Sequence, residues 1–322
     1  MKKRTLIIAI SVIVILLAGY WITDRLLFDG IRPQKIDQDG IKGNFYLAQN
    51  TKNSAAILLI GGGPWGDYWG SEFAKKGFVG LSLPYTRLDG LPQLPEEIPL
   101  EYFQKALIWL SEQPKVNSDK IMVMGASRNA ELALLIASYF PELVSGAIAY
   151  SPSSVSWSNT VLPFNSDELK ASWTFKGENV PYIPMDKIKP GNSSTINTLD
   201  YWSGGLNQKE YVEKATIKVE KINGPILLLS GKSDEVWPSA QMAIMIEDRL
   251  KAFNLGHKVQ NIQYDNAGHL ISGNPDSQTE VRTGKMTIQG KQYNFRYGGT
   301  NQGDFKAKQD AKNRVLELIS NV

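Results

Sequence analysis

The chain has 322 residues but no cysteine, and its only histidines are His257 and His269. Without thiols it can form no disulfide bond, no thiolate nucleophile and no cysteine-based metal site. The two histidines lie apart and belong to no His–Glu cluster of the kind that binds catalytic zinc. We therefore expect no metal and no other cofactor, and a catalytic histidine must be one of these two.

An excess of charge of one sign is also missing from most of the chain. It carries 35 Lys and Arg against 32 Asp and Glu, and Lys2, Lys3 and Arg4 make up the difference, because removing these three leaves 32 basic residues. A nearly neutral folded part lacks the basic surface that nucleic-acid binding requires. We expect no nucleic-acid partner.

Polar side chains are almost absent from residues 6–22, a run of 17 residues in which Ser11 is the clearest polar break. This length is at the lower limit for crossing a bilayer and exceeds most signal-peptide cores. No Ala-x-Ala pattern follows, and Tyr20 stands where a bacterial lipoprotein would have cysteine. We predict that residues 1–24 form an uncleaved signal anchor and transmembrane helix; the alternative is a cleaved signal peptide and a secreted form.

The basic residues before this run contrast with the mixed charges of Asp24 and Arg25 after it. Basic flanks of a membrane-spanning segment remain in the cytoplasm. We therefore predict a single-pass protein of the cell membrane, with a cytoplasmic N-terminus and residues 25–322 outside the cytoplasm.

A short apolar stretch, residues 121–126, turns through Ser127 into a second apolar stretch, residues 131–139. This order predicts a strand, a sharp turn and a helix, the layout of a nucleophile elbow that holds a serine hydroxyl clear of the sheet. Gly125 fits the G-x-S-x-G pattern, whereas Asn129 replaces its second glycine. Ser127 is the candidate nucleophile, and a chance turn is the alternative.

A serine nucleophile needs a base within hydrogen-bond reach, itself oriented by a third group. His269 follows the predicted strand 259–264, so it lies at a carboxyl end, where α/β sheets gather their chemistry. His257 lies in the polar connection before that strand. We choose His269 as the base; the alternative is a loop histidine that only packs.

The candidate acid follows the buried strand predicted at residues 225–230. Asp234 lies 107 residues after Ser127 and 35 before His269, which gives the Ser, acid, His order of α/β hydrolases. Glu235 is the alternative acid. We prefer Asp234, because a shift of one position points the side chain elsewhere.

Consecutive glycines, Gly61-Gly62-Gly63, follow the strand predicted at residues 55–60. Such a loop lets backbone N–H groups approach a developing oxyanion. We assign the oxyanion hole to the N–H groups of this loop, Gly62 and Gly63 above all, together with that of Arg128. A flexible turn is the alternative, and a phosphate loop is disfavoured because no Lys-Ser or Lys-Thr pair follows the glycines.

Buried strands alternate with helical patterns along the remaining chain, which predicts one α/β domain at residues 25–322 with a mostly parallel sheet and helices on both faces. A polar and aromatic insertion at about residues 152–222 is typical of a lid. A second insertion, residues 273–299, contains a predicted β-hairpin. We predict that Trp65, Trp157 and Trp237 line the substrate pocket, with ordinary packing as the alternative.

The sequence resembles the carboxyl-terminal catalytic domain shared by bile acid-CoA:amino acid N-acyltransferases and acyl-CoA thioester hydrolases, from about residue 37 to near the C-terminus. The resemblance is carried by residues 61–63, 125–134, 150–157, 231–234, 267–269 and 298–300. It implies an α/β-hydrolase fold and a Ser or Cys nucleophile with Asp and His, carried here by Ser127, Asp234 and His269. It also implies a cap over the acyl pocket and action on acyl thioesters.

Two departures from the family affect the interpretation. Acyl-CoA type members carry a sizeable β-sandwich domain before the catalytic one, whereas only about 30 residues lie between the apolar run and the first predicted strand here. Asn129 must either widen the spacing of strand and helix or lean toward the site. We predict a membrane-anchored serine hydrolase that acts on an acyl ester or thioester; because the predicted topology places it outside the cytoplasm, we expect an ester, thioester or amide other than free acyl-CoA. The alternatives are an acyltransferase with the same triad and a decayed hydrolase that only binds its ligand.

Overall fold

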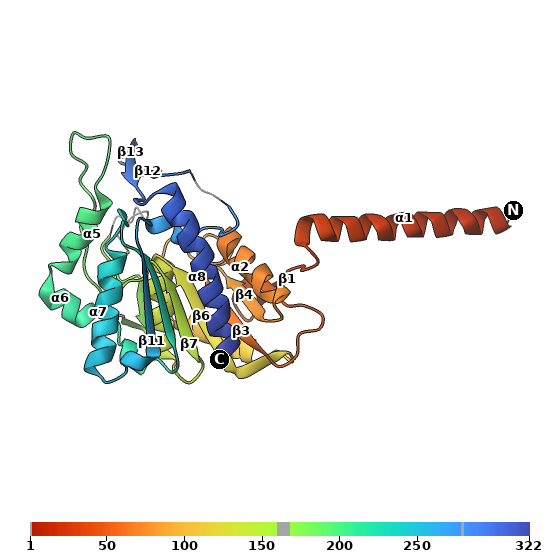
Figure 1. Ribbon diagram of the computed structural model, residues 1–322, viewed down its shortest axis with the longest axis horizontal. Coiled ribbons are helices and arrows are strands. Elements are labelled where there is room, and N and C mark those ends of the chain that lie inside the picture. Colours follow the sequence, from red (N-terminus) through yellow and green to blue (C-terminus); the bar gives the residue numbers. More distant parts are fainter. Residues whose placement is uncertain (1, 160–167, 278–279) are drawn as a thin grey trace.

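A sheet of eight strands forms the centre of the computed structural model, which describes residues 2–159, 168–277 and 280–322 (Figure 1). The strand order is β1-β2-β4-β3-β6-β7-β10-β11. The pairs from β4 to β11 are parallel, while β1–β2 and β2–β4 are antiparallel. The strands are β1 (Gln34–Gln38), β2 (Ile41–Tyr46), β3 (Ser54–Ile60), β4 (Val79–Leu83), β6 (Val116–Ala126), β7 (Gly146–Tyr150), β10 (Ile226–Gly231) and β11 (Val259–Tyr264).

The inner strands are continuous apolar runs because both of their faces are covered. Every residue of β7 and β10 is buried, as is every residue of β3 after Ser54. The edge strand β1 is different, since only Ile36 is partly buried and the other four residues are exposed. An exposed edge with charged residues resists pairing with other chains.

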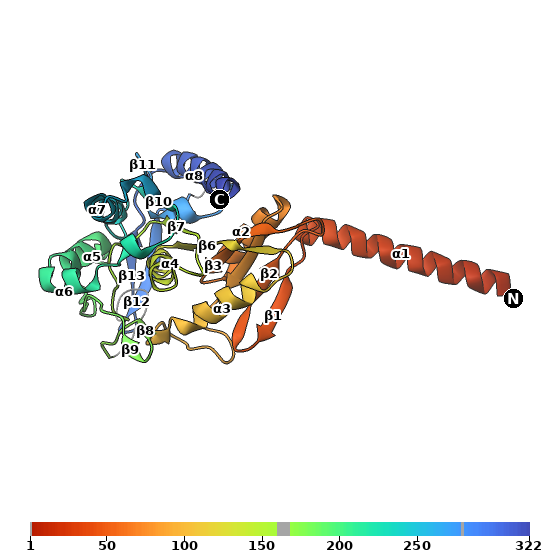
Figure 2. The same ribbon diagram turned by 90° about the horizontal axis from the view of Figure 1, so that it is seen from below.

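Helices cover both faces of the sheet, and alternate residues of each strand point to opposite faces (Figures 1 and 2). Leu58 and Leu228 pack with α3 (Glu101–Ser111), α4 (Arg128–Tyr139) and α7 (Ser239–Ala252) on one face. Leu59 and Leu229 pack with α2 (Gly63–Lys75) and α8 (Asn301–Asn321) on the other.

Two insertions lie beyond the carboxyl ends of the parallel strands. The first contains β8 (Trp173–Phe175), β9 (Glu178–Asn179), α5 (Thr198–Leu206), α6 (Lys209–Ala215) and η1 (Val219–Lys221), and β8 pairs with β5 (Ile98–Pro99). It has its own apolar cluster around Trp157, Trp202 and Trp237. The second is the hairpin β12 (Thr283–Ile288) and β13 (Lys291–Arg296), which turns through Gln289 and Gly290, both with positive φ.

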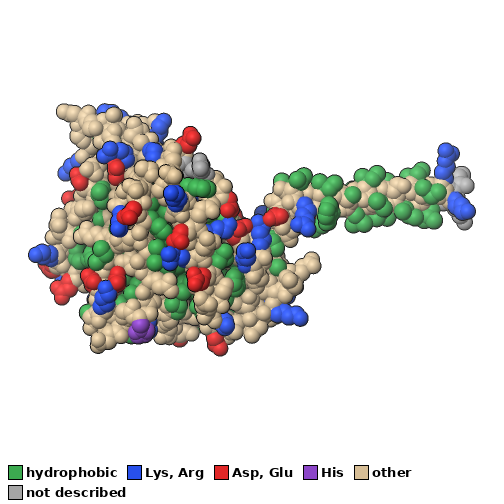
Figure 3. Space-filling model, in the orientation of Figure 1, with side chains coloured by type: hydrophobic (Ala, Val, Ile, Leu, Met, Phe, Trp, Pro, Cys, Tyr) green, Lys and Arg blue, Asp and Glu red, His purple; other side chains and the backbone are tan. Residues whose placement is uncertain are grey.

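The N-terminal helix α1 (Lys2–Phe28) projects from the domain beside β1, and apolar side chains cover its length (Figures 1 and 3). By length and composition residues 3–28 could cross a membrane: an 18-residue window of this helix has a mean hydropathy of 2.6, and none of that window is buried. The helix continues four residues beyond the predicted boundary at residue 24, because Leu26, Leu27 and Phe28 extend the apolar run.

The predicted strands and helices around the site are confirmed, as are the mostly parallel sheet and the hairpin in the second insertion. The hairpin β1–β2 was not predicted, because its short polar strands lack a clear alternation of apolar and polar residues. Residues 160–167 of the predicted lid, residues 278–279 of the second insertion and Met1 of the anchor lie outside the described residues.

Candidate active site

Ser127 stands in a sharp turn between β6, which ends at Ala126, and α4, which begins at Arg128. Its backbone has φ 57° and ψ −123°, a conformation that L-residues adopt only under constraint. The Ser127 N–H donates to the carbonyl of Tyr150 at 2.8 Å. A Cβ atom at Gly125 would lie 2.0 Å from the Asn129 carbonyl oxygen, so only glycine permits this close approach of strand and helix.

The structure brings together the side chains of Ser127, His269 and Asp234. The distance from His269 Nε2 to Ser127 Oγ is 3.0 Å, and the distance from His269 Nδ1 to Asp234 Oδ2 is 2.9 Å. These are hydrogen-bond distances, and their order is that of a nucleophile, a base and an orienting acid. His257 is exposed in η2 (Gly256–Lys258), which precedes β11 at the other end of the sheet.

The Asp234 carboxylate is buried, with 2% of its side chain exposed, and is fixed by several donors. Oδ1 accepts from the N–H groups of Val236 at 2.9 Å and Trp237 at 3.2 Å, while Oδ2 accepts from Ser239 Oγ at 2.7 Å. Glu235 points away and pairs with Arg296 at 2.6 Å. Asp234 is therefore the acid in contact with His269.

A segment after the hairpin joins the loops that carry Asp234 and His269. The carbonyl of Tyr297 accepts from the N–H groups of His269 at 2.9 Å and Glu235 at 3.4 Å. Gly298 forms an antiparallel bridge with Asp234, and its own φ is 73°. A Cβ atom on Gly298 would lie 1.8 Å from the Ser233 carbonyl oxygen. Only glycine fits this position.

Asp304, in the first turn of α8, holds the loop that carries His269. It is 1% exposed, its Oδ1 accepts from Gly268 N–H at 2.7 Å, and its Oδ2 pairs with Arg282 at 2.6 Å. The contacts that Tyr297, Ser239 and Asp304 make at the site were not predicted from the sequence. The one available signal was the glycine pair at residues 298–299, which entered only as part of the family resemblance.

The backbone N–H groups of Gly62, Gly63 and Arg128 belong to the starts of two helices. Gly63 is the first residue of α2 and Arg128 is the first residue of α4, so neither N–H has an acceptor within its helix. All three residues line the cavity at Ser127. Gly61 cannot contribute, contrary to prediction, because its N–H donates to the Leu83 carbonyl at 3.0 Å.

The cavity at Ser127 has a volume of about 970 Å³. Its wall includes residues 61–64, residues 126–129, residues 84–89, and residues 35–37 and 42–44 of the edge hairpin. The prediction that Trp157 and Trp237 line the substrate pocket is wrong, because they are 0% and 1% exposed and pack in the apolar cluster of the lid. Trp65 is also absent from the cavity wall, and its ring N–H donates to the Ser272 carbonyl at 2.9 Å.

Asn129 leans toward the site and leaves the spacing of β6 and α4 tight. Its Oδ1 accepts from the Tyr85 hydroxyl at 2.8 Å, and its Nδ2 packs against Gly61. Burial raises the pKa of Tyr85, so this hydroxyl remains protonated and can donate. Asn129 and Tyr85 thus form part of the cavity wall beside the glycine loop.

A buried ion pair next to Ser127 fixes the lid to α4. The Arg128 guanidinium pairs with Glu131 and donates to Ser172 Oγ at 2.6 Å. Glu131 Oε1 accepts from the ring N–H of Trp173 at 2.8 Å and from the backbone N–H of Trp157 at 3.2 Å. Burial raises the pKa of Glu131, and the Arg128 charge opposes this shift.

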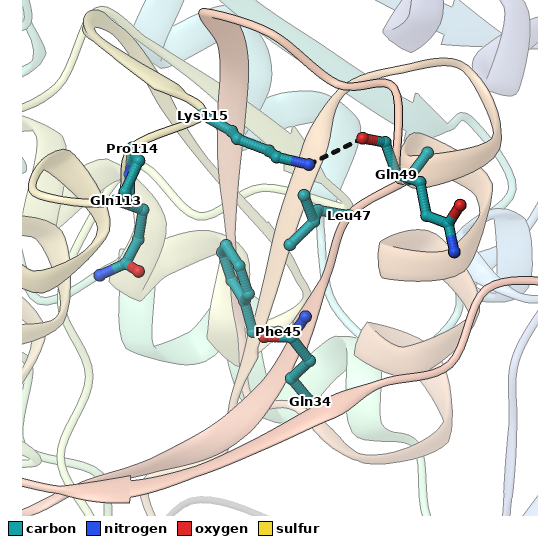
Figure 4. Close-up of a pocket in the computed structure, with 8 residues that line it drawn as sticks. Gln34, Phe45, Leu47, Gln49, Gln113, Pro114 and Lys115 are labelled. Atoms are coloured by element: carbon teal, nitrogen blue, oxygen red, sulfur yellow. Dashed lines mark hydrogen bonds between the residues drawn. The ribbon is translucent and has the colours of Figure 1, made fainter.

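A smaller cavity, about 330 Å³, lies at the amino end of β6, whereas Ser127 follows its carboxyl end (Figure 4). Lys115 donates to the Gln49 carbonyl at 2.8 Å beside it. The residues that line it include no histidine, serine or carboxylate, so it has no acid–base pair. Among the residues that the structure describes, no three His, Asp or Glu side chains form a group that could hold a metal ion.

Comparison with known proteins finds relatives along most of the chain. Residues 98–321 match the family described as BAAT / acyl-CoA thioester hydrolase C terminal. Human acyl-coenzyme A thioesterase 6 is 27% identical over 290 residues, which cover 89% of this chain and 64% of the relative. Rat mitochondrial acyl-coenzyme A thioesterase 2 is 30% identical over 246 residues, which cover 75% of this chain and 50% of the relative.

Mouse acyl-coenzyme A amino acid N-acyltransferase 2 is 27% identical over 250 residues, which cover 75% of this chain and 55% of the relative. This chain therefore spans between 50% and 64% of the length of these three curated relatives.

Solved structures show the fold. A dienelactone hydrolase-like promiscuous phosphotriesterase from metagenomic libraries superposes with a TM-score of 0.53 at 13% identity, covering 90% of this chain and 98% of its own. A thermophilic esterase of Thermogutta terrifontis gives a TM-score of 0.50 at 13% identity, covering 90% of this chain and 91% of its own. The predicted α/β-hydrolase fold is confirmed.

Proposed function

Because this chain belongs to the BAAT / acyl-CoA thioester hydrolase C-terminal family, we propose that it is a serine hydrolase that cleaves an acyl ester or thioester. One observation carries the proposal, the hydrogen-bonded series from Ser127 through His269 to Asp234. A strained serine backed by a histidine and a buried carboxylate is the arrangement that activates a hydroxyl near neutral pH.

In the proposed reaction Ser127 Oγ attacks the acyl carbonyl while its proton passes to His269 Nε2. The resulting tetrahedral intermediate expels the alcohol or thiol, which takes the proton from His269 and leaves the acyl group on Ser127. Water then attacks the acyl-enzyme by the same steps, releases the carboxylic acid and restores the Ser127 hydroxyl. Asp234 holds the tautomer of His269 in which Nε2 can accept the proton.

The oxyanion of this intermediate would bind at the starts of α2 and α4. The N–H groups of Gly62, Gly63 and Arg128 border the cavity, and the positive ends of both helix dipoles point toward it. One donor of this kind contributes ~10²-fold or more to the rate of acyl transfer.

Labelling with a fluorophosphonate tests the nucleophile. The wild-type protein should react and the label should map to Ser127, whereas Ser127→Ala should not react. Ser111→Ala removes a serine hydroxyl at the end of α3 and is the matched control, which should react like wild type. Equal labelling of wild type and Ser127→Ala would refute the serine-hydrolase proposal and leave a binding protein as the better interpretation.

An acyltransferase is the second candidate, because one relative is named as an amino acid N-acyltransferase. It would use the same acyl-enzyme and differ only in letting an amine displace Ser127 in place of water. Comparing the products with and without added amino acid separates the two activities. Amide as the main product would establish the transferase.

We also propose that residues 1–24, of which residues 2–24 belong to α1, anchor the protein in the cell membrane, with residues 25–322 outside the cytoplasm as a hydrolase domain that carries a lid. The apolar helix and its basic N-terminal residues support this placement. Since free acyl-CoA is cytoplasmic, the substrate would be a different ester or thioester. Protease added to intact protoplasts should digest the domain. Protection until lysis would place it inside and restore acyl-CoA as the leading substrate.

A further inference from the structure

The last turn of α1 lines a cavity of its own. Leu26 and Leu27 are 79% and 69% exposed, and with Phe28 they form one wall of a cavity of about 520 Å³. The remaining lining comes mainly from β2 and α2 and is polar, with Asn44 and Ser71 beside the charged side chains of Asp67, Glu72 and Lys75. The membrane helix therefore ends beside a hollow in the domain surface.

One exposed ion pair joins the end of α1 to the domain, and Arg32 packs back on the last turns of the helix. Asp29, next after the helix, pairs with Lys75 at the end of α2 at 2.8 Å. Arg32 pairs with Asp24, and its guanidinium lies over the rings of Tyr20 and Phe28 at 4.4 and 4.8 Å. Aromatic and basic side chains at the end of an apolar helix mark the interface between membrane and water. The bilayer surface would thus lie at the last turns of α1, against the end of α2.

This hollow adjoins the catalytic cavity. Asn44 and Asp67 line both, and Asn44 Nδ2 donates to Asp67 Oδ1 at 2.9 Å between them. Helix α2 runs along the two cavities, with Gly63 and Pro64 in the catalytic one and Ser71 and Lys75 in the hollow at α1. Its 13 residues span roughly 20 Å at 1.5 Å per residue. The helix that presents Gly63 N–H to the oxyanion therefore ends where the membrane surface would begin.

From these shared wall residues we propose that the substrate is an acyl amphiphile resident in the bilayer, and that it reaches Ser127 along α2 past Asn44 and Asp67, from the hollow at α1 to the catalytic cavity. This inference rests on the proposed hydrolase activity and on the membrane anchor. The apolar wall of Leu26, Leu27 and Phe28 receives the substrate at the bilayer surface. The reacting carbonyl then lies between Ser127 and the start of α2, while the rest of the molecule extends toward α1.

Full-length protein in phosphatidylcholine vesicles tests the path with two substrates, a long-chain fluorogenic ester that partitions into the vesicles and a short water-soluble ester. The readout is the ratio of kcat/KM for the first to kcat/KM for the second. Ser71→Trp narrows the hollow at α1 and should lower this ratio about tenfold, equivalent to roughly 1.4 kcal/mol. Gln38→Trp, exposed on β1 and outside both cavities, is the matched control and should give the wild-type ratio.

Leu27→Asp provides a second variant, since an exposed position tolerates a charge without loss of the fold and the new charge opposes lipid binding at the hollow. It should lower the ratio in the same direction. A wild-type ratio in both Ser71→Trp and Leu27→Asp would overturn the proposed path, as would a wild-type protein that hydrolyses only the soluble ester. If wild type cleaves neither ester, the hydrolase activity itself fails.

Discussion

Ser127 is held by the turn around it and by one hydrogen bond to Tyr150 of the neighbouring strand, whereas Asp234 and His269 also depend on residues 297–304 near the end of the domain. On the nucleophile side the strained turn depends on Gly125 and on the first turn of α4. On the acid–base side the two loops touch directly, since the Ser233 N–H donates to the Ala267 carbonyl at 2.9 Å, and Tyr297 and Gly298 add contacts to both loops from a distant segment. One half of the site is therefore a local motif and the other half is a product of tertiary structure.

The two halves of the site therefore have different structural requirements. The elbow needs one tight turn, whose unfavourable φ and ψ cost of order 1–3 kcal/mol and are maintained by the packing of β6 and α4. The acid–base side needs several backbone contacts between loops that are distant in sequence. We expect substitutions on the acid–base side to lower kcat more than a substitution on the nucleophile side, which should mainly lower stability.

The largest effect should come from the acid–base side itself. His269→Ala should lower kcat by ~10³ or more, because the three side chains act as a unit and no other base contacts Ser127 among the described residues. Asp234→Ala should lower kcat less than His269→Ala does. Steady-state hydrolysis of one soluble ester measures all variants. Glu235→Ala is the matched control and should retain most activity; a loss as large as that of Asp234→Ala would show that Glu235 is the acid.

Gly298→Ala should have the next largest effect, about 10- to 100-fold in kcat. The added methyl group meets the Ser233 carbonyl and forces the Asp234 loop away from the His269 loop. Gly290→Ala is the matched control because it has the same positive φ, 78° against 73°, but open space around the added Cβ. It should cost about 1 kcal/mol of stability and leave kcat unchanged. Equal kcat in the two variants would show that residues 297–298 do not position the triad.

The smallest effect should come from Asn129 on the nucleophile side. Asn129→Gly should keep kcat within about threefold of wild type, because the close contact at Gly125 involves the backbone of residue 129. It should lose about 1–2 kcal/mol of stability, since the buried Tyr85 hydroxyl loses its acceptor. Chemical denaturation of Asn129→Gly, Tyr85→Phe and the double variant measures this coupling. A large fall in kcat with folding intact would show that the Asn129 amide takes part in the reaction.

The same division explains how much of the site could be predicted from the sequence. Ser127, Asp234 and His269 could be proposed because each follows a strand of the parallel sheet, and parallel strands bring their carboxyl ends to one edge of the sheet. Asp304 could not, because an acidic residue near a helix start is ordinary and its contact with Gly268 spans 36 residues. Trp157 and Trp237 show the opposite limit, since an aromatic residue in a lid sequence is equally compatible with a pocket wall and a buried core.

The late position of Gly298 and Asp304 in the chain also has a consequence for biosynthesis. Contacts between residues 127, 234, 269 and 298 have large sequence separation, and such contacts form after the local ones during folding. A ribosome-bound chain that ends before residue 297 already contains the elbow but lacks Tyr297 and Gly298, which contact the loops of Asp234 and His269. We therefore expect the nascent chain to reach its full proposed activity only after residues 297–304 have been made.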